Sequence, residues 1–272
     1  NWDYWIPSPC PPYKIDLPMV SQCRTLKIIS TPSTGSTHID RNDLTKLINL
    51  DIRTLQNHPE LCKITASSEW TFALILQSLR KAKSVEKSIR SGLWREDEER
   101  MRGSQLYGKS VGLIGFGRIG SNVARYAHAF NMRVHAYDID DSIIYPDYVN
   151  KENSIVDVAT LSDVFCVCVH LTESTKQLID STIIELFKSD VIVVNTSRGE
   201  VIDEALLFKK LQEGKIGGLT LDVLDNEVNY KKSEIYKRRN EFDNLILTPH
   251  IAGLSEESEK LAFKIALSNL LN

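Results

Sequence analysis

Three side chains in the second half of the chain, Arg198, Glu227 and His250, have types suited to proton transfer on a small carboxylic acid. His250 can exchange a proton near working pH, because the unperturbed pKa of histidine is about 6.5. A carboxylate beside it, such as Glu227, would favour the imidazolium and fix the ring. Arg198 can bind a carboxylate through two parallel N–H bonds and polarise a neighbouring carbonyl. Together these groups fit the reduction of a 2-keto acid, in which hydride reaches the carbonyl carbon and the alkoxide takes a proton.

A glycine-rich loop, residues 115–120, carries the spacing GxGxxG between a predicted strand and a predicted helix. Gly115 permits the tight turn, Gly117 lets the backbone approach a pyrophosphate, and Gly120 lets the helix pack closely on the strand. The free N–H groups and the dipole of the helix favour an anion at its N-terminus. Because the motif has the required context on both sides, it predicts a dinucleotide site.

An acidic residue follows the next predicted strand, at Asp138, 18 residues after Gly120. A carboxylate at this position accepts hydrogen bonds from the adenosine ribose hydroxyls and repels a 2′-phosphate. The three residues that follow, Ile139, Asp140 and Asp141, include no Arg or Lys that would bind that phosphate. The sequence therefore predicts NAD (NADH) as the cofactor in preference to NADP.

The elements that must position these residues form a regular pattern from Val111 onward. Short apolar runs alternate with helical segments, which is typical of βαβ units and a parallel sheet covered on both faces. The predicted strands are 111–114, 133–137, 164–169, 191–194, 219–223 and 245–247, and the predicted helices include 119–130, 181–187 and 204–213. In an open parallel sheet, ligands bind at the carboxyl ends of the strands. Arg198, Glu227 and His250 all follow such ends, as does Asp222.

The first third of the chain is less regular. It predicts short strands near 2–6 and at 26–30, followed by the polar turn 33–37. Helical spacing of apolar residues predicts a helix over 41–50 and a longer amphipathic helix over 69–85.

Length and composition exclude several classes of protein. The chain has 272 residues, and 33 Lys and Arg against 36 Asp and Glu give a formal net charge of −3. This length suggests two domains, or one large one. The near-neutral balance argues against a nucleic-acid-binding protein, which would carry a basic stripe. No apolar run approaches the roughly 18 residues needed to span a bilayer, so no membrane partner is expected.

The five cysteines also limit the possibilities. Their odd number and the lack of CxxC spacing indicate neither a disulfide framework nor a zinc site, and no metal is expected. Cys166 and Cys168 lie in an apolar run and are expected to be buried, reduced thiols. A cytoplasmic location follows as an expectation.

The sequence resembles the D-isomer-specific 2-hydroxyacid dehydrogenase family over nearly its whole length. The matching segments are 33–40, 115–120, 195–199, 222–227 and 248–253. The resemblance implies that Arg198 orients the substrate, that Glu227 is the partner acid, and that His250 donates and accepts the proton. It also implies that Asp222 lies near the nicotinamide.

The resemblance further implies the ligand contacts. The expected cofactor-binding residues are Gly115, Gly117, Arg118, Ile119, Gly120, Asp138, His170, Thr196, Ser197, Asp222 and Gly253. The substrate is expected to be a small 2-keto or 2-hydroxy acid. Its carboxylate is expected to meet Arg198 and the turn formed by Ser33, Thr34 and Gly35, whose backbone amides can bind it.

The same resemblance gives a domain plan of the α/β class. A doubly wound, parallel-sheet Rossmann cofactor domain is expected over residues 77–252. A smaller flavodoxin-like α/β substrate domain is expected from residues 1–76 and 253–272. These two end segments are short for such a domain, so we expect the chain to lack its N-terminal strand. A homodimer is expected through the stretch from Val85 to Trp94.

Some positions depart from the family pattern, and two other functions remain open. Val228 and His170 stand where the family commonly has Pro, which affects the loops near the nicotinamide. One alternative is an NAD(H)-sensing interaction protein, like the corepressors of the family, which binds a peptide. The other is a 3-phosphoglycerate dehydrogenase-type enzyme. Residues 7–8 and 31 offer no Arg for its phosphate, although Lys14, Arg24 or Lys27 could substitute.

Overall fold

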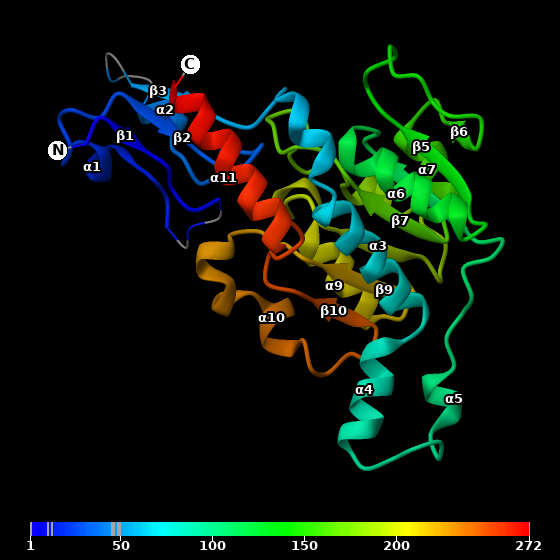
Figure 1. The fold of residues 1–272 in the computed structure, drawn as a ribbon. Helices are drawn as coiled ribbons and strands as arrows, with labels where there is room; N and C mark the ends of the chain where they lie inside the picture. The colour runs from blue at the N-terminus through cyan, green and yellow to red at the C-terminus, as the bar shows by residue number, and fades with distance from the viewer. Residues whose placement is uncertain (1, 10, 12, 45–46, 48–49, 272) are drawn as a thin grey trace. The chain divides into compact units, whose positions relative to one another are not determined.

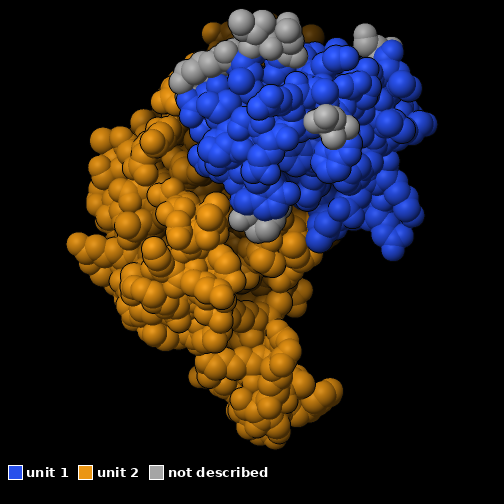
Figure 2. Space-filling view, turned by 90° about the vertical axis from the view of Figure 1, so that its left-hand side faces the viewer, with its two compact units in different colours: residues 1–66, 253–272 blue, residues 67–252 orange. Residues whose placement is uncertain are grey.

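The structure is a computed structural model that describes residues 2–9, 11, 13–44, 47 and 50–271. The chain divides into two compact units, which have different colours in Figure 2. The first unit comprises residues 1–66 and 253–272, and the second unit comprises residues 67–252. The division falls at the start of helix α3 (Ala66–Leu79), whereas the boundary expected from the sequence, at residue 76, falls inside this helix.

A seven-stranded, all-parallel sheet forms the centre of the second unit (Figure 1). Its order is β10–β9–β8–β7–β4–β5–β6. The strands are β4 (Ser110–Ile114), β5 (Arg133–Tyr137), β6 (Val149–Lys151), β7 (Val164–Val167), β8 (Ile192–Asn195), β9 (Gly218–Leu221) and β10 (Leu245–Leu247). From β4 the chain first proceeds outward through β5 and β6, and it then continues on the other side of β4 with β7. The point where the strand order reverses therefore lies between β4 and β7, as in the doubly wound Rossmann arrangement predicted from the sequence.

Helices cover both faces of this sheet, which is why the central strands read as continuous apolar runs. Every residue of β4, β7, β8 and β9 is buried. Side chains of α3 and α6 (Arg118–Ala129) form one core with one face of the sheet. On the other face, the core contains side chains of α7 (Ile155–Leu161), α8 (Ser181–Ile184), α9 (Glu204–Gln212) and α10 (Glu234–Arg238).

The single helix predicted over 69–85 is wrong, because α3 ends at Leu79 and a second helix, α4 (Ala82–Arg90), follows. Lys81 between them has a φ of +51°. The Leu79 carbonyl accepts a hydrogen bond from the Ser104 N–H at 2.8 Å. Gly103 packs so closely here that a Cβ on it would lie 2.4 Å from the same carbonyl oxygen. A tertiary contact therefore interrupts a pattern that by itself favours a continuous helix.

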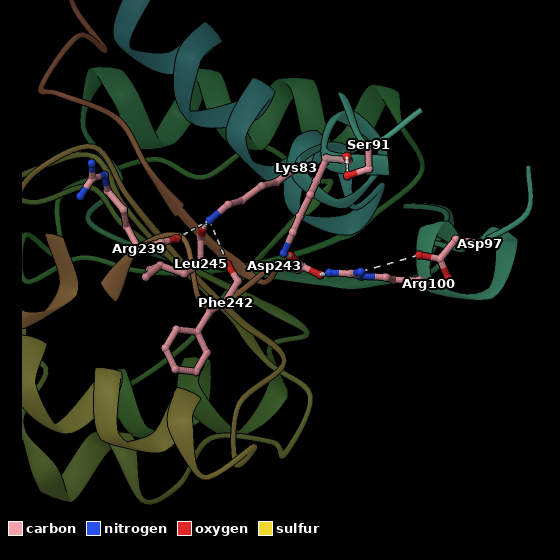
Figure 3. Close-up of polar contacts among 9 residues, drawn as sticks. Lys83, Ser91, Asp97, Arg100, Arg239, Phe242, Asp243 and Leu245 are labelled. Atoms are coloured by element: carbon pink, nitrogen blue, oxygen red, sulfur yellow. Dashed lines mark hydrogen bonds and ion pairs between the residues drawn. The ribbon is translucent and has the colours of Figure 1, made fainter. Parts of the chain in front are cut away.

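Lys83 attaches α4 to the segment around β10 (Figure 3). Its ammonium group donates three hydrogen bonds, to the backbone carbonyls of Arg239 (2.5 Å), Phe242 (2.9 Å) and Leu245 (2.7 Å). Nearby, Lys87 of α4 and Arg100 of α5 (Glu98–Met101) both bind the carboxylate of Asp243. Burial lowers the pKa of Lys83. These charged groups tie α4 and α5 to the rest of the second unit.

The first unit contains a three-stranded parallel sheet of order β1–β2–β3 (Tyr4–Trp5, Ile28–Ser30 and Asp51–Arg53). Helix α11 (Glu256–Leu271) contacts β2, where the Ser30 hydroxyl donates to the Ala266 carbonyl at 2.8 Å. Shorter helical segments are α1 (Leu17–Val20), α2 (Arg41–Leu44) and η1 (Pro59–Lys63). The helix predicted over 41–50 begins at Arg41, and its residues 45–46 and 48–49 lie outside the described residues.

Candidate functional site

The glycine loop lies at the reversal point of the large sheet, between β4 and α6. Gly115 has a φ of +92°, and a Cβ on it would lie 2.9 Å from the carbonyl oxygen of Cys168, just after β7. A Cβ on Gly120 would lie 2.1 Å from the carbonyl oxygen of Gly115, so only glycine lets α6 pack here. A Cβ on Gly117 would meet nothing within 4 Å. The backbone at Gly117 is therefore open to a ligand, while Gly115 and Gly120 are tightly packed.

The residues around this loop fit a dinucleotide. Gly117 is the N-cap of α6, and within the described part of the chain no side chain caps this helix end. The N–H groups and the helix dipole there can therefore bind an anion. The carboxylate of Asp138, after β5, accepts hydrogen bonds from the N–H groups of Phe116 (2.7 Å) and Asp140 (3.0 Å). These bonds fix the carboxylate beside the loop, where its remaining lone pairs can accept ribose hydroxyls.

Basic side chains gather near the same loop. Arg118 is the first residue of α6, and burial lowers its pKa. The pKa of His170, after β7, is lowered first by desolvation and then by the positive charges of Arg198 and Arg118. The two guanidinium groups create a positive local potential near His170, which suits phosphate or carboxylate oxygens.

His250 and Glu227 meet as the sequence predicts. His250 follows β10, and Glu227 is the first residue of the 3₁₀ turn η3 (Glu227–Lys232). The distance from His250 Nδ1 to Glu227 Oε2 is 2.7 Å, and the two side chains are 23% and 39% exposed. Since a carboxylate only accepts hydrogen bonds, Nδ1 carries a proton, and Nε2 is the nitrogen suited to proton exchange with a substrate.

Asp222 holds the segment that carries His250. It is completely buried, at the end of β9. Its carboxylate accepts hydrogen bonds from the Thr248 hydroxyl (2.5 Å), the Ile251 N–H (3.1 Å) and the Ala252 N–H (2.8 Å). Its carbonyl accepts from the His250 N–H at 2.7 Å. These bonds keep His250 at a φ of +54°, which non-glycine residues rarely adopt.

The segment after β8 is organised by Asn195. Its Oδ1 accepts hydrogen bonds from the N–H (3.0 Å) and hydroxyl (2.8 Å) of Ser197, and its Nδ2 donates to the Arg198 carbonyl at 2.8 Å. The Thr196 hydroxyl forms a buried hydrogen bond of 2.7 Å with the hydroxyl of Thr71 on α3. The side chain of Thr196 therefore points to α3, which leaves its backbone for any ligand contact.

Sequence reasoning missed two contacts of the loop that leads to Glu227. A Cβ on Gly199, in η2 (Gly199–Val201), would lie 2.1 Å from the Asp225 nitrogen, so η2 packs directly on the loop before Glu227. Glu204, the first residue of α9, accepts a hydrogen bond from the Asp225 N–H at 2.5 Å. Burial raises the pKa of Glu204 to about 7, and nearby carboxylates contribute to the shift. No sequence signal distinguishes Glu204, because acids are common in the first turn of a helix.

The predicted substrate turn lies in the first unit, after β2. The Ser33 hydroxyl donates to the Gly35 carbonyl at 2.6 Å and hydrogen-bonds the Thr31 hydroxyl at 2.9 Å. In the described ranges, the N–H groups of Thr34 and Gly35 have no protein acceptor, so they are available to an anionic oxygen. Gly253 is the first residue of the second segment of this unit.

Three further observations concern the described residues only. They include no group of three or more His, Cys, Asp or Glu that could hold a metal ion. The free cysteines among them are Cys23, Cys62, Cys166 and Cys168. None of the described helices combines the length and the apolar character that crossing a membrane requires.

Comparison with known proteins identifies the family. Residues 72–252 match the family described as D-isomer specific 2-hydroxyacid dehydrogenase, NAD binding domain. A glyoxylate reductase of Thermofilum pendens is 34% identical over 267 residues, which cover 95% of this chain and 75% of that protein. A D-3-phosphoglycerate dehydrogenase of Archaeoglobus fulgidus is 32% identical over 268 residues, which cover 95% of this chain and 47% of that protein. The chain belongs to the D-isomer specific 2-hydroxyacid dehydrogenase family.

A solved structure supports the same assignment. The D-lactate dehydrogenase from Aquifex aeolicus, complexed with NAD and lactic acid, superposes with a TM-score of 0.83 and 28% identity. The similarity covers 99% of this chain and 82% of that chain. The family, the Rossmann-type fold and the NAD(H) cofactor that the sequence predicts are thus confirmed.

Proposed function

We propose that this protein interconverts a D-2-hydroxy acid and its 2-keto acid with NAD(H). The observation that carries the proposal is the 2.7 Å contact between His250 Nδ1 and Glu227 Oε2, on the sheet edge that also carries the glycine loop. The relatives named as a glyoxylate reductase and a D-lactate dehydrogenase support a small acid of this class as the substrate.

Each residue of the catalytic set has a defined role in the proposed reaction. NADH, when bound, supplies the hydride that reduces the carbonyl carbon. Arg198 binds the substrate through charge-assisted hydrogen bonds and polarises its carbonyl. His250 donates a proton from Nε2 to the alkoxide oxygen, and in the oxidation it takes this proton back. Glu227 stabilises the imidazolium and fixes the ring through Nδ1. The amides of Thr34 and Gly35 are proposed to bind the substrate carboxylate.

The cofactor contacts follow from the fit described above. The N-terminus of α6, with Gly117, Arg118, Ile119 and Gly120, would hold the pyrophosphate, and Asp138 would hold the adenosine ribose. The remaining proposed contacts are Gly115, His170, Thr196, Ser197, Asp222 and Gly253. Because the Asp138 carboxylate repels a 2′-phosphate, kcat/KM is expected to be higher with NADH than with NADPH. Equal values for the two cofactors would contradict this preference.

Steady-state assays with His250→Gln test the proposal. The variant is expected to turn over about 10²- to 10⁴-fold more slowly, because it lacks the proton donor. NADH binding, measured by fluorescence titration, is expected to be unchanged. His128→Gln, on the exposed side of α6, is the matched control and is expected to keep full activity. Turnover of His250→Gln at the wild-type rate would refute the assigned role.

The choice of 2-keto acids in the assay separates the alternatives. The similarity to a D-3-phosphoglycerate dehydrogenase makes a phosphorylated 2-keto acid a necessary member of the panel. Oxidation of NADH is followed at the absorbance of the reduced nicotinamide. If NADH binds and no 2-keto acid of the panel is reduced, the result favours the NAD(H)-sensing interaction protein. A peptide pull-down would then be the next experiment.

We also propose the expected organisation of the molecule. The first unit would be the substrate domain and the second unit the cofactor domain. A homodimer is supported by exposed hydrophobic side chains in and after α4, namely Val85 (38% exposed), Ile89 (48%), Leu93 (37%) and Trp94 (75%). Such side chains gathered on one element often mark an interface. A cytoplasmic location is supported by the free cysteines.

A further inference from the structure

Glu204 lies beside the catalytic pair but has no part in the chemistry proposed above. It is the first residue of α9, where the carboxylate of Asp203 already caps the helix by accepting the Leu206 N–H at 2.9 Å. The Glu204 carboxylate is therefore not needed as a cap. It instead accepts the Asp225 N–H at 2.5 Å, outside its own helix.

Asp225 lies in the loop that connects β9 to Glu227. Val223 and Leu224 anchor the start of this loop by burial, at 1% and 6% exposed. Beyond them, Asn226 has a φ of +57°, and the Leu224 N–H donates to Glu227 Oε1 at 3.3 Å. Glu227 thus uses one oxygen within its own loop and the other for His250. The direction of the Glu227 carboxylate consequently depends on the conformation of the loop, two residues beyond the N–H that Glu204 binds.

We propose that Glu204 is a positioning residue, whose carboxyl group holds the loop 222–227 so that Glu227 meets Nδ1 of His250. The inference rests on the proposed function only for its effect on turnover. The hydrogen bond itself, and its effect on the His250 ring, are independent of which substrate the protein takes.

Several acids face the Glu204 carboxylate. Asp225 and Glu227 approach from the loop and η3, Glu200 from η2, and Asp203 is its neighbour at the start of α9. Burial among these acids raises the pKa of Glu204 to about 7. As the pH rises through this value, Glu204 becomes charged and its hydrogen bond to Asp225 becomes charge-assisted and stronger. The anchoring of the loop is therefore expected to change near neutral pH.

Three variants test the role through kinetics. Glu204→Leu removes the acceptor, and we expect kcat to fall about 10- to 100-fold, because small displacements in a catalytic set have effects of this size. The Kd for NADH is expected to stay within about twofold, which also shows that the variant folds. Glu204→Gln keeps an acceptor oxygen and should recover most of the rate. Its pH profile should lose the contribution of Glu204 near pH 7, which the profile of Glu213→Gln should keep. Glu213→Gln, at the far end of α9 and paired with Lys215, is the control that should match wild type.

NMR tests the same role without turnover. The amide proton of Asp225 is expected to shift with pH in wild type, with a midpoint near 7, and to be flat in Glu204→Gln. The ring signals of His250 are expected to move in Glu204→Leu. A wild-type kcat in Glu204→Leu, or an Asp225 amide that does not titrate in wild type, would overturn the proposal. If wild type reduces no 2-keto acid, the proposed function fails, whereas the two NMR signals still decide whether Glu204 holds the loop.

Discussion

At the scale of single residues, the site depends on a backbone conformation that sequence reasoning did not foresee. The types and spacing of Arg198, Glu227 and His250 were sufficient to predict a proton-transfer set. The positive φ of His250 and the three hydrogen bonds that the Asp222 carboxylate accepts were not predictable. They arise because β9 and β10 are neighbours in the sheet, which places an acid from one strand end under the segment that follows the other.

Asp222→Asn tests this anchor. The amide nitrogen cannot accept a hydrogen bond, so at least one donor among Thr248, Ile251 and Ala252 would be left unpaired in a buried place. We expect the free energy of unfolding to fall by about 1–3 kcal/mol, measured by urea denaturation. Asp141→Asn, at a side chain that is 94% exposed, is the control and should leave it unchanged. Equal stability of the two variants would show that Asp222 does not act as an anchor.

At the scale of elements, the strand order separates the residues that fit a cofactor from the proposed catalytic residues. The strands β4, β5 and β7 end at the residues that fit a cofactor, and β8, β9 and β10 end at Arg198, Asp222 and His250. Apolar runs were enough to predict these strands, and every residue of β4, β7, β8 and β9 is buried. The edge strand β6 was missed, since Asn150 and Lys151 are exposed and give it no apolar pattern. The helix α7 was missed although Ser154, its N-cap, accepts the Asp157 N–H at 3.2 Å and is a usable start signal.

Gly120→Ala tests the packing of α6 on the glycine loop. The added methyl would lie 2.1 Å from the Gly115 carbonyl oxygen, so helix and loop must separate. We expect the affinity for NADH to fall at least about tenfold and stability to fall by about 1–3 kcal/mol. Gly214→Ala is the matched control: its Cβ meets nothing within 4 Å, although its φ is +66°. An NADH affinity in Gly120→Ala equal to that of the control would contradict the assigned packing role.

Asp163, at the amino ends of the strands and therefore opposite the proposed site, gives a pH-dependent prediction. Asp163 accepts hydrogen bonds from the Ser110 N–H (2.7 Å) and from Lys188 (2.7 Å). Desolvation alone would raise the pKa of Asp163, but these partners outweigh it and the pKa is lowered. A lowered folded-state pKa stabilises the protein above the unfolded pKa of about 3.9, and this stabilisation is lost as pH falls through the folded value. Asp163→Asn should therefore lose less stability than wild type between pH 5 and 3, as measured by thermal denaturation; parallel losses would contradict this.

At the scale of the whole molecule, the exposed hydrophobic residues of the α4 region bear on assembly. A Trp94 side chain that is 75% exposed is costly in water and would be covered in a dimer. We expect wild type to sediment as a dimer at micromolar concentration and Trp94→Lys to sediment as a monomer. Trp2→Lys, at another exposed tryptophan (71%), is the control and should remain dimeric. A monomeric wild type would remove the dimer from the proposed function.

The close approach of Gly115 to the Cys168 carbonyl has a consequence for resistance to oxidation. It places the glycine loop against the end of β7, where two thiols lie, Cys166 and Cys168. Burial raises the pKa of Cys168 to about 12, and it raises that of Cys166 as well. Because oxidants and alkylating agents attack the thiolate, these sulfurs are nearly inert at neutral pH. The glycine loop thus packs against thiols that react slowly. Oxidants would modify exposed thiols such as Cys62 before those beside the nucleotide site.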